Sequence, residues 1–155
     1  MLTIRKVETR DSAELVKLGQ EFYESTVFAD VIKFDPISLL HTIFSNIDQP
    51  NFNCWVAELD GKIIGAVAGY AYPFQYNLSN LIIMELFWHV NIEYRKSGAG
   101  DLLHKEFENW GREIHASAMQ MGYTDSPESK RVEKIYRHKG FVENGKMFVK
   151  ELKYV

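Results

Sequence analysis

An apolar run and a glycine-containing turn meet at residues 90–100, which read Val90-Asn91-Ile92-Glu93-Tyr94-Arg95-Lys96-Ser97-Gly98-Ala99-Gly100. The run before this turn, residues 81–90, is almost entirely apolar, which predicts a central strand covered on both faces. Behind the turn, apolar side chains recur at helical spacing at Leu103, Phe107, Trp110 and Ile114. The sequence therefore predicts a strand, a tight turn and a long helix in succession.

The turn from Arg95 to Gly100 has the features of an anion site. Loop amides and the N-terminus of the following helix converge with a partial positive charge, and glycine lets a ligand approach the backbone closely. Arg95 and Lys96 add positive charge. A diphosphate fits these features, and so does an ordinary helix-entry turn without a ligand. The dinucleotide-binding pattern G-x-G-x-x-G is broken at Leu103, and no Walker A loop is present.

Outward from this turn, the hydrophobic pattern predicts the other elements. Strands are expected at residues 2–7, 52–59, 62–72, 81–90 and 116–121, around Val142, and at 147–154. Helices are expected from Asp11, where Glu14 completes a capping box, from Asp35-Pro36 to about Asn46, after Gly100, and from Ser126-Pro127 to about Lys139, ending at Gly140. Hairpin turns are signalled by Asp60-Gly61 and Asn144-Gly145.

The resulting order, β-α-α-β-β-β-α-β-α-β-β, indicates an α/β (α+β) fold with a mixed sheet and helices packed on it. The chain has 155 residues, which suits one domain over residues 1–155. Eighteen Lys and Arg against 21 Asp and Glu give a net charge of −3. Such a balance lacks the clustered basic excess of a nucleic-acid surface, so no nucleic-acid partner is expected.

The sequence also predicts a cytoplasmic protein with no membrane partner. Its single cysteine, Cys54, cannot form an internal disulfide, and it is expected to be buried packing. No run approaches the ~20 apolar residues that span a bilayer, and the first residues lack the apolar stretch of a secretory signal. The five histidines show no ligand spacing, so no metal is expected.

Two motifs resemble the GCN5-related N-acetyltransferase (GNAT) family. Residues 90–100 resemble its acetyl-CoA signature, a strand ending in Val followed by R/Q-x-x-G-x-G/A. Forty residues later, Tyr136-Arg137-His138-Lys139-Gly140-Phe141 resembles its second motif, Tyr-x-x-x-Gly-Phe. The expected order of elements matches the family along essentially the full length. The resemblance therefore implies a mostly antiparallel central sheet with helices on both faces.

The resemblance also implies a cosubstrate, acetyl-CoA, with its pyrophosphate on the amides of residues 96–100 and its pantetheine along residues 90–92. The implied cofactor contacts are Val90, Asn91, Ile92, Arg95, Lys96, Ser97, Gly98, Ala99, Gly100 and Ser129. Ser129 stands where the family often has Asn, and Ile92 stands where it often has proline. An amide near Val90 is suited to stabilise the oxyanion of a tetrahedral intermediate, an effect of ~3 kcal/mol.

Direct transfer of an acetyl group to an amine needs a base for the amine and an acid for the leaving thiolate. By resemblance, Tyr136 is the acid; a packing role beside the cofactor is the alternative. Glu85 is the candidate base, acting directly or through water, because it lies within an apolar run and burial raises a carboxyl pKa. A structural glutamate is the alternative there, and His89 is a second candidate base. Strand alternation places Glu85, Phe87 and His89 on one face, unless a bulge shifts the register.

We therefore expect an acetyl-CoA-dependent N-acetyltransferase acting on a primary amine of a small molecule or a peptide. Acceptor specificity is expected from the first two helices, including Phe22, and from the loop after the third strand. Acyl transfer to a hydroxyl or of a longer acyl group would keep the enzyme class. A non-catalytic acyl-CoA-binding regulatory module with the same fold is the other reading. A homodimer is a further implication of the resemblance.

Overall fold

The computed structural model describes residues 1–124 and 128–153. Within them, five strands form one sheet in the order β1-β2-β3-β4-β5. The strands are β1 (Leu2–Lys6), β2 (Phe52–Leu59), β3 (Lys62–Phe74), β4 (Asn77–Val90) and β5 (Ala118–Gln120). Neighbours from β1 to β4 are antiparallel, and β5 is parallel to β4. The expected mixed, mostly antiparallel sheet is confirmed.

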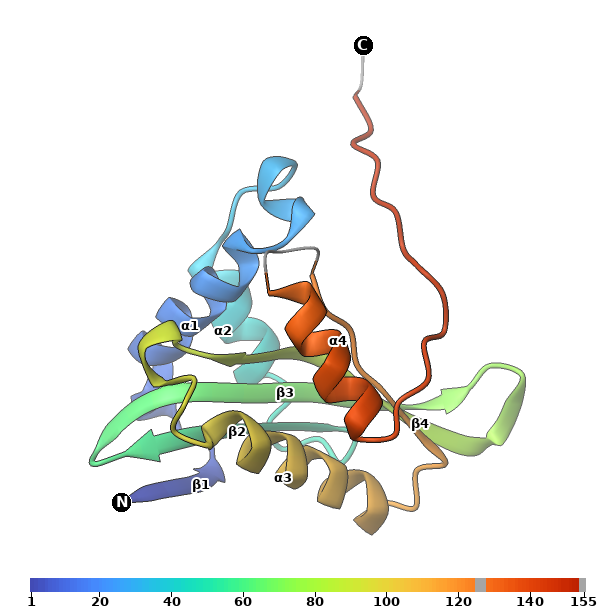
Figure 1. The fold of residues 1–155 in the computed structure, drawn as a ribbon, viewed down its shortest axis with the longest axis horizontal. Coiled ribbons are helices and arrows are strands. Elements are labelled where there is room, and N and C mark those ends of the chain that lie inside the picture. The colour runs from blue at the N-terminus through green and yellow to red at the C-terminus, as the bar shows by residue number, and fades with distance from the viewer. Residues whose placement is uncertain (125–127, 154–155) are drawn as a thin grey trace.

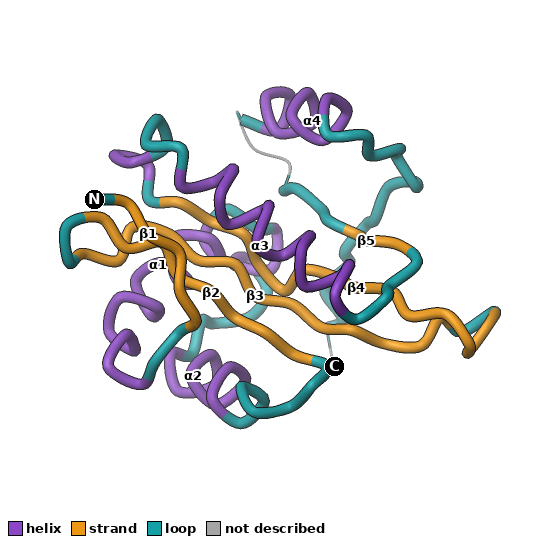
Figure 2. Tube along the Cα trace, turned by 90° about the horizontal axis from the view of Figure 1, so that it is seen from below, coloured by secondary structure: helices purple, strands orange, loops and turns teal. Residues whose placement is uncertain are grey.

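Helices cover both faces of this sheet (Figures 1 and 2). They are α1 (Ser12–Glu24), α2 (Pro36–Phe44), α3 (Ala99–Glu113) and α4 (Ser129–His138). Leu15 of α1 and Ile43 of α2 pack with Phe87 in one core cluster. Leu103 and Phe107 of α3 belong to a second cluster on the opposite face. Two apolar cores thus hold the sheet between two helical layers.

Two local predictions are confirmed, and a third is wrong. The Asp35 carboxylate accepts hydrogen bonds from the Ile37 and Ser38 amides at the start of α2, and Asp60 and Gly61 adopt φ of 50° and 84° in the β2–β3 turn. Asp11, however, does not cap α1. Both of its oxygens accept from the Arg5 guanidinium at 2.8 Å. A bidentate pair of this kind is stronger than a cap, so Asp11 stands at the N-cap position before Ser12 without a side-chain bond to the helix.

A bulge in β4 changes which side chains share a face. Phe87 pairs with Ala68 and Glu85 pairs with Gly69, so Leu86 between them is the extra residue. The expectation that Glu85 lies on the same face as Phe87 and His89 is therefore wrong, because the bulge reverses the alternation. Phe87 and His89 face α1, whereas Glu85 faces the side of α3 and α4.

The C-terminal segment is the largest departure from the sequence prediction. Residues 141–153 form neither helix nor strand, and they extend past α4 away from the sheet (Figure 1). Val142, Met147 and Phe148 are 87%, 91% and 92% exposed. The strands expected around Val142 and at 147–153 do not form: among the described residues, no strand pairs with residues 142–153, and a strand needs a partner.

The helix predicted near the C-terminus is present as α4, and it ends before Gly140, as predicted; Gly140 has a φ of +87°. The expected start of that helix, Ser126-Pro127, and the last residue of the expected final strand, Tyr154, lie outside the described residues.

A substitution at Gly69 can test how tightly β3 packs beside the β4 bulge. A Cβ atom at Gly69 would lie 2.4 Å from the Met84 carbonyl oxygen and 2.6 Å from Phe107. Gly69→Ala should therefore lower the free energy of unfolding by about 2 kcal/mol, as overpacking does, measured by urea denaturation. Gly100→Ala is the matched control, because its Cβ would lie 3.6 Å from the nearest side chain. Equal midpoints for both variants would contradict this packing.

Candidate active site

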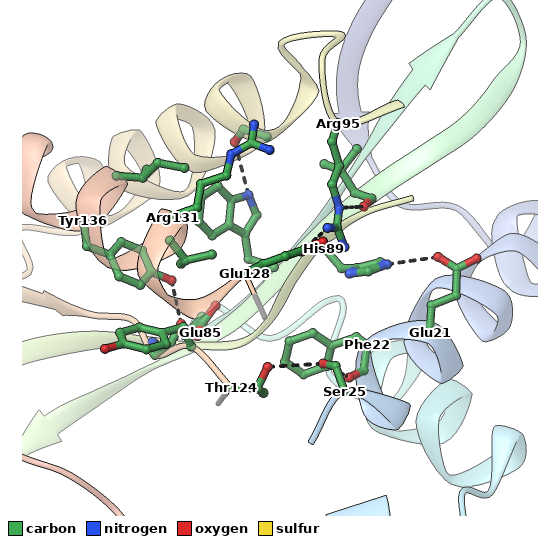
Figure 3. Close-up of a pocket in the computed structure, with 17 residues that line it drawn as sticks. Glu21, Phe22, Ser25, Glu85, His89, Arg95, Thr124, Glu128, Arg131 and Tyr136 are labelled. Atoms are coloured by element: carbon green, nitrogen blue, oxygen red, sulfur yellow. Dashed lines mark hydrogen bonds and ion pairs between the residues drawn. The ribbon is translucent and has the colours of Figure 1, made fainter. Parts of the chain in front are cut away.

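A cavity opens where β5 separates from β4 (Figure 3). β5 pairs with β4 only from Ile82 to Met84, so the β4 edge from Glu85 to Val90 has no strand beside it among the described residues. The cavity next to this edge has a volume of about 370 Å³. A strand edge left open in this way offers backbone groups to an extended ligand.

The Val90 amide points toward this open side. The Asn91 N–H donates to the Ile64 carbonyl of β3 at 2.9 Å. Because successive N–H groups of a strand point to opposite sides, the Val90 N–H faces away from β3. The Val90 carbonyl likewise accepts from Arg95 Nε at 3.4 Å rather than from β3. Val90 thus presents a backbone donor where the strands part.

The loop after β4 leads into α3 through a position whose backbone conformation favours glycine. Gly98 has φ of +86° and precedes the first residue of α3, Ala99. The Ser97 hydroxyl accepts from the Ala99 amide at 3.2 Å, and Trp88 Nε1 donates to the Gly100 carbonyl at 3.1 Å. The first turn of a helix has amides without intrahelical partners and carries the positive end of the helix dipole. The loop therefore has backbone features that suit an anion.

Glu85 and Tyr136 both hydrogen-bond to the backbone of one residue, Gly122. The Gly122 amide donates to Glu85 Oε1 at 2.7 Å, and the Tyr136 hydroxyl donates to the Gly122 carbonyl at 2.6 Å (Figure 3). Both side chains line the cavity. The bulge at Leu86 makes this possible, because it turns Glu85 to the face on which α4 packs. A potential base and a potential acid are thereby held side by side.

Burial shifts the protonation of both groups. Removal from water raises the pKa of Glu85 from its ordinary 4.5 to about 7, and the Gly122 amide opposes that shift. Burial is the larger cause that raises the pKa of Tyr136 well above its ordinary range, and the charge of Glu85 is the smaller one. Near neutral pH, Glu85 can therefore accept or release a proton, whereas the phenol stays protonated.

A second acid–base pair lies across β4, on the side of α1. His89 Nε2 is 3.0 Å from Glu21 Oε2, and Asn91 Nδ2 donates to Glu21 Oε1 at 2.9 Å. The His89 ring also contacts Phe22, with the ring centroids 6.3 Å apart. Glu21, Phe22 and His89 line the same cavity as Glu85. The cavity thus has titratable groups on both faces of one strand.

Two arginines lie on the other wall of the cavity (Figure 3). Arg95 forms an ion pair with Glu128 next to the start of α4, and Arg131 projects from the first half of that helix. The guanidinium groups lie near the glycine loop and α4, whereas Glu21 lies on α1. Arg95 and Glu128 thus pair with each other beside the glycine loop, while Glu21 adds a carboxylate from α1.

The cavity brings some of the predicted site residues together and leaves others outside. Those that line it are Glu85, Val90, Arg95, Gly100 and Tyr136. Those that do not are Asn91, Ile92, Lys96, Ser97, Gly98, Ala99 and Ser129. Ala99, the first residue of α3, is fully buried and can offer a ligand only its backbone, whereas Ile92 is 67% exposed.

Sequence reasoning missed several residues that line the cavity. They are Glu21, Ser25, Gly122, Tyr123, Thr124, Glu128, Arg131, Val132 and Ile135. For α4 a signal existed, because Val132 lies one helical turn before Tyr136 and Glu128 one turn earlier still. Glu21 had no such signal, since only the packing of α1 on the sheet places it beside His89.

Other candidate chemistry is absent from this site. Cys54 is fully buried in the core on the α1 side, and burial raises the pKa of its thiol, so it is packing as expected. Residues 1–124 and 128–153 contain no group of three His, Cys, Asp or Glu side chains that could hold a metal ion. In the same part of the chain, no helix is long and apolar enough to cross a membrane.

The sequence matches the family model described as "Acetyltransferase (GNAT) domain" over residues 50–143. This match covers more than half of the chain and contains the open strand edge, the glycine loop and Tyr136. The protein therefore belongs to the GNAT family. No curated protein sequence matches the chain.

Solved structures share the fold at low sequence identity. AAC(6')-Iy in complex with a bisubstrate analogue, CoA-S-monomethyl-acetylneamine, has 15% identity and a TM-score of 0.76, with 99% of each chain covered. A ribosomal-protein-alanine N-acetyltransferase from Brucella melitensis has 17% identity and a TM-score of 0.72, covering 97% of this chain and 99% of that one. A Clostridium acetobutylicum predicted acetyltransferase with acetyl-CoA has 15% identity and a TM-score of 0.75, covering 97% and 96%.

The raised pKa of Glu85 should appear in the pH dependence of stability. Because the folded state holds this proton more tightly than the unfolded state, the contribution is complete below about pH 4.5 and is lost as pH rises through about 7. Stability should fall by about 2–3 kcal/mol across that window. Urea unfolding at several pH values should show this fall reduced in Glu85→Gln and retained in Glu113→Gln, which changes an exposed carboxylate. If the free energy of unfolding had the same pH dependence in Glu85→Gln and the unmodified protein, the raised pKa would not belong to Glu85.

Proposed function

We propose that the protein transfers the acetyl group of acetyl-CoA to a primary amine of a small molecule or a peptide by direct attack. Glu85 acts as the base, directly or through water, and Tyr136 protonates the leaving thiolate. The observation that carries the proposal is that Glu85 and Tyr136 both bond to the backbone of Gly122, one to its N–H and the other to its carbonyl, within the cavity next to the open end of β4.

Chemical fit supports acetyl-CoA as the cosubstrate. The positive end of α3 and the loop amides of residues 96–100 suit a pyrophosphate, with Arg95 and Lys96 nearby. The unpaired edge of β4 suits the amides of pantetheine, which can bind as an added strand does. In this arrangement the Val90 N–H would donate to the thioester carbonyl and stabilise the negative charge that develops there. Ser129, at the first turn of α4, is the remaining proposed contact.

The acceptor side is supported by the negative wall of the cavity. An amine arrives as a cation at neutral pH, since a lysine-like amine has a pKa of ~10.4, and Glu21 and Glu85 both line its path. The structural relatives include enzymes named for aminoglycosides and for ribosomal-protein alanine. An acceptor panel should therefore contain an aminoglycoside, simple alkylamines and a peptide with an N-terminal alanine.

Acetyl-CoA should stabilise the protein, and one member of the panel should release free thiol in its presence. The first effect is measured by thermal shift and the second by a thiol-reactive dye. Stabilisation without thiol release from any acceptor would instead support a non-catalytic acyl-CoA-binding module. Release that depends on a hydroxyl acceptor or a longer acyl-CoA would keep the enzyme class and change the substrate.

Tyr136→Phe should lower kcat about 100-fold, as loss of a general acid does, while the Kd for acetyl-CoA from calorimetry stays within twofold. Tyr123→Phe is the matched control, because this second tyrosine also lines the cavity, with its ring centroid 6.3 Å from that of Tyr136. Its kcat should stay within a few-fold of the unmodified protein. Equal losses of kcat and affinity in Tyr136→Phe would show that the tyrosine only shapes the binding site.

The apolar side chains of residues 141–153 support a homodimer as a further proposal. Several of them are almost fully exposed in the single chain, and exposed apolar surface marks interaction sites. Light scattering coupled to size-exclusion chromatography should give twice the 18.0 kDa chain mass. A mass of one chain at all concentrations would exclude it.

A further inference from the structure

The proposed reaction has to dispose of two protons from the acceptor. Its balance is R–NH3⁺ + CH3CO–S–CoA → R–NH–COCH3 + HS–CoA + H⁺. One proton must leave before attack, because an ammonium group has no lone pair. The second leaves nitrogen after the new C–N bond has formed, and the thiolate takes up one proton as the C–S bond breaks. One base is therefore needed before attack and one after it.

The cavity has two bases on opposite faces of β4. Glu85 lies on the side of Tyr136, where its carboxylate accepts from the Gly122 N–H and the phenol donates to the Gly122 carbonyl. His89 lies on the side of α1, and its side chain is 12% exposed. Both line the cavity, so an amine bound in it at the open edge of β4 can meet a base from each face of the strand.

Glu21 determines how His89 can act. Its carboxylate has no proton to donate, so at the 3.0 Å contact His89 Nε2 must carry the hydrogen. In the neutral ring, Nδ1 then has the free lone pair. Asn91 donates to the other oxygen of Glu21 at 2.9 Å, which fixes the orientation of the carboxylate. Glu21 is itself 40% exposed, which gives this pair a route to solvent for the proton.

The charged groups around the pair suit this role. Glu21 on α1 is the carboxylate in contact with the ring, and it stabilises the imidazolium that forms when His89 takes up a proton. Arg95, on the other wall, is engaged by Glu128. The Phe22 ring beside His89 offers an aromatic face to an arriving cation. An ammonium group entering along α1 therefore meets this pair on its way to the thioester.

We propose that His89 is a second catalytic base of the acetyl transfer and that Glu21 is its positioning residue. His89 takes the first proton, from the ammonium form of the acceptor, and releases it to solvent. Glu85 takes the second, from nitrogen after attack. Tyr136 gives its proton to sulfur and regains one from Glu85, which restores all three groups. This division of labour rests on the proposed function.

The test uses two acceptors that differ in whether the first step is needed. One is the best alkylamine of the panel, and the other is its O-alkylhydroxylamine isostere, which is uncharged at pH 7. His89→Gln and Glu21→Gln should lower kcat/KM for the alkylamine by about 100-fold, as loss of a general base does. Both variants should keep kcat/KM for the isostere within a few-fold of the unmodified protein. Glu85→Gln should lower kcat/KM for both acceptors, because Glu85 takes up the proton that leaves nitrogen after attack.

Glu24→Gln is the matched control on α1. Its carboxylate accepts from Gln20 and lies outside the cavity, so both acceptors should be unaffected. Added imidazole should restore part of the alkylamine activity of His89→Ala. Melting curves and acetyl-CoA binding confirm that each variant is folded. If the isostere is not accepted, assays of the alkylamine from pH 7 to 9.5 make the same comparison, because the amine loses its own proton as pH rises.

The outcomes separate the two proposals. Equal losses for both acceptors in His89→Gln and Glu21→Gln, with the unmodified protein active, would overturn the role of His89 and leave the acetyltransferase proposal standing. A His89→Gln defect that persists at pH 9.5 would overturn it as well. An unmodified protein that releases thiol with neither acceptor would overturn both.

Discussion

The parting of β5 from β4, together with the bulge at Leu86, is the constraint on which the site depends. A regular β4 paired along its whole length with β5 would leave no free backbone edge, and its side chains would alternate without interruption. One inserted residue instead places Glu85 on the α4 face while Phe87 and His89 stay on the α1 face. Bulges re-aim side chains in this way near many active sites. A single strand thereby supplies polar groups to both sides of one cavity.

The backbone of Gly122 holds both candidate proton-transfer groups of the site without an ion pair. Its N–H satisfies Glu85 and its carbonyl satisfies Tyr136, so neither polar side chain is buried without a partner. A carboxylate bound by one amide keeps its second oxygen available for a proton. Burial in the same place raises the pKa of both groups. The site therefore meets the cost of desolvation with backbone rather than with a counter-charge that would fix Glu85 as an anion.

What could be predicted from the sequence was local. Asp35-Pro36 and Asp60-Gly61 act on their own neighbours, and both formed the predicted cap and turn. Asp11 failed as a cap because its carboxylate pairs with Arg5, six residues earlier on β1, and the capping pattern does not include that competing partner. The position of the bulge had no sequence signal, since Leu86 resembles the other residues of the apolar run. Glu21 could be assigned to a helix but not to a site, because its two partners are 68 and 70 residues away.

The anchoring of α4 links the two halves of the site. Glu128 at one end is paired with Arg95 of the glycine loop. Tyr136, two turns further, bonds to Gly122, and Lys139 beyond it bonds to Asp101 of α3 at 2.9 Å. The helix is thus tied to the loop that suits a diphosphate, to the segment after β5, and to the helix behind the loop. Because catalysis tolerates little displacement of a proton donor, these three attachments fix the phenol relative to both the open strand edge and the anion site.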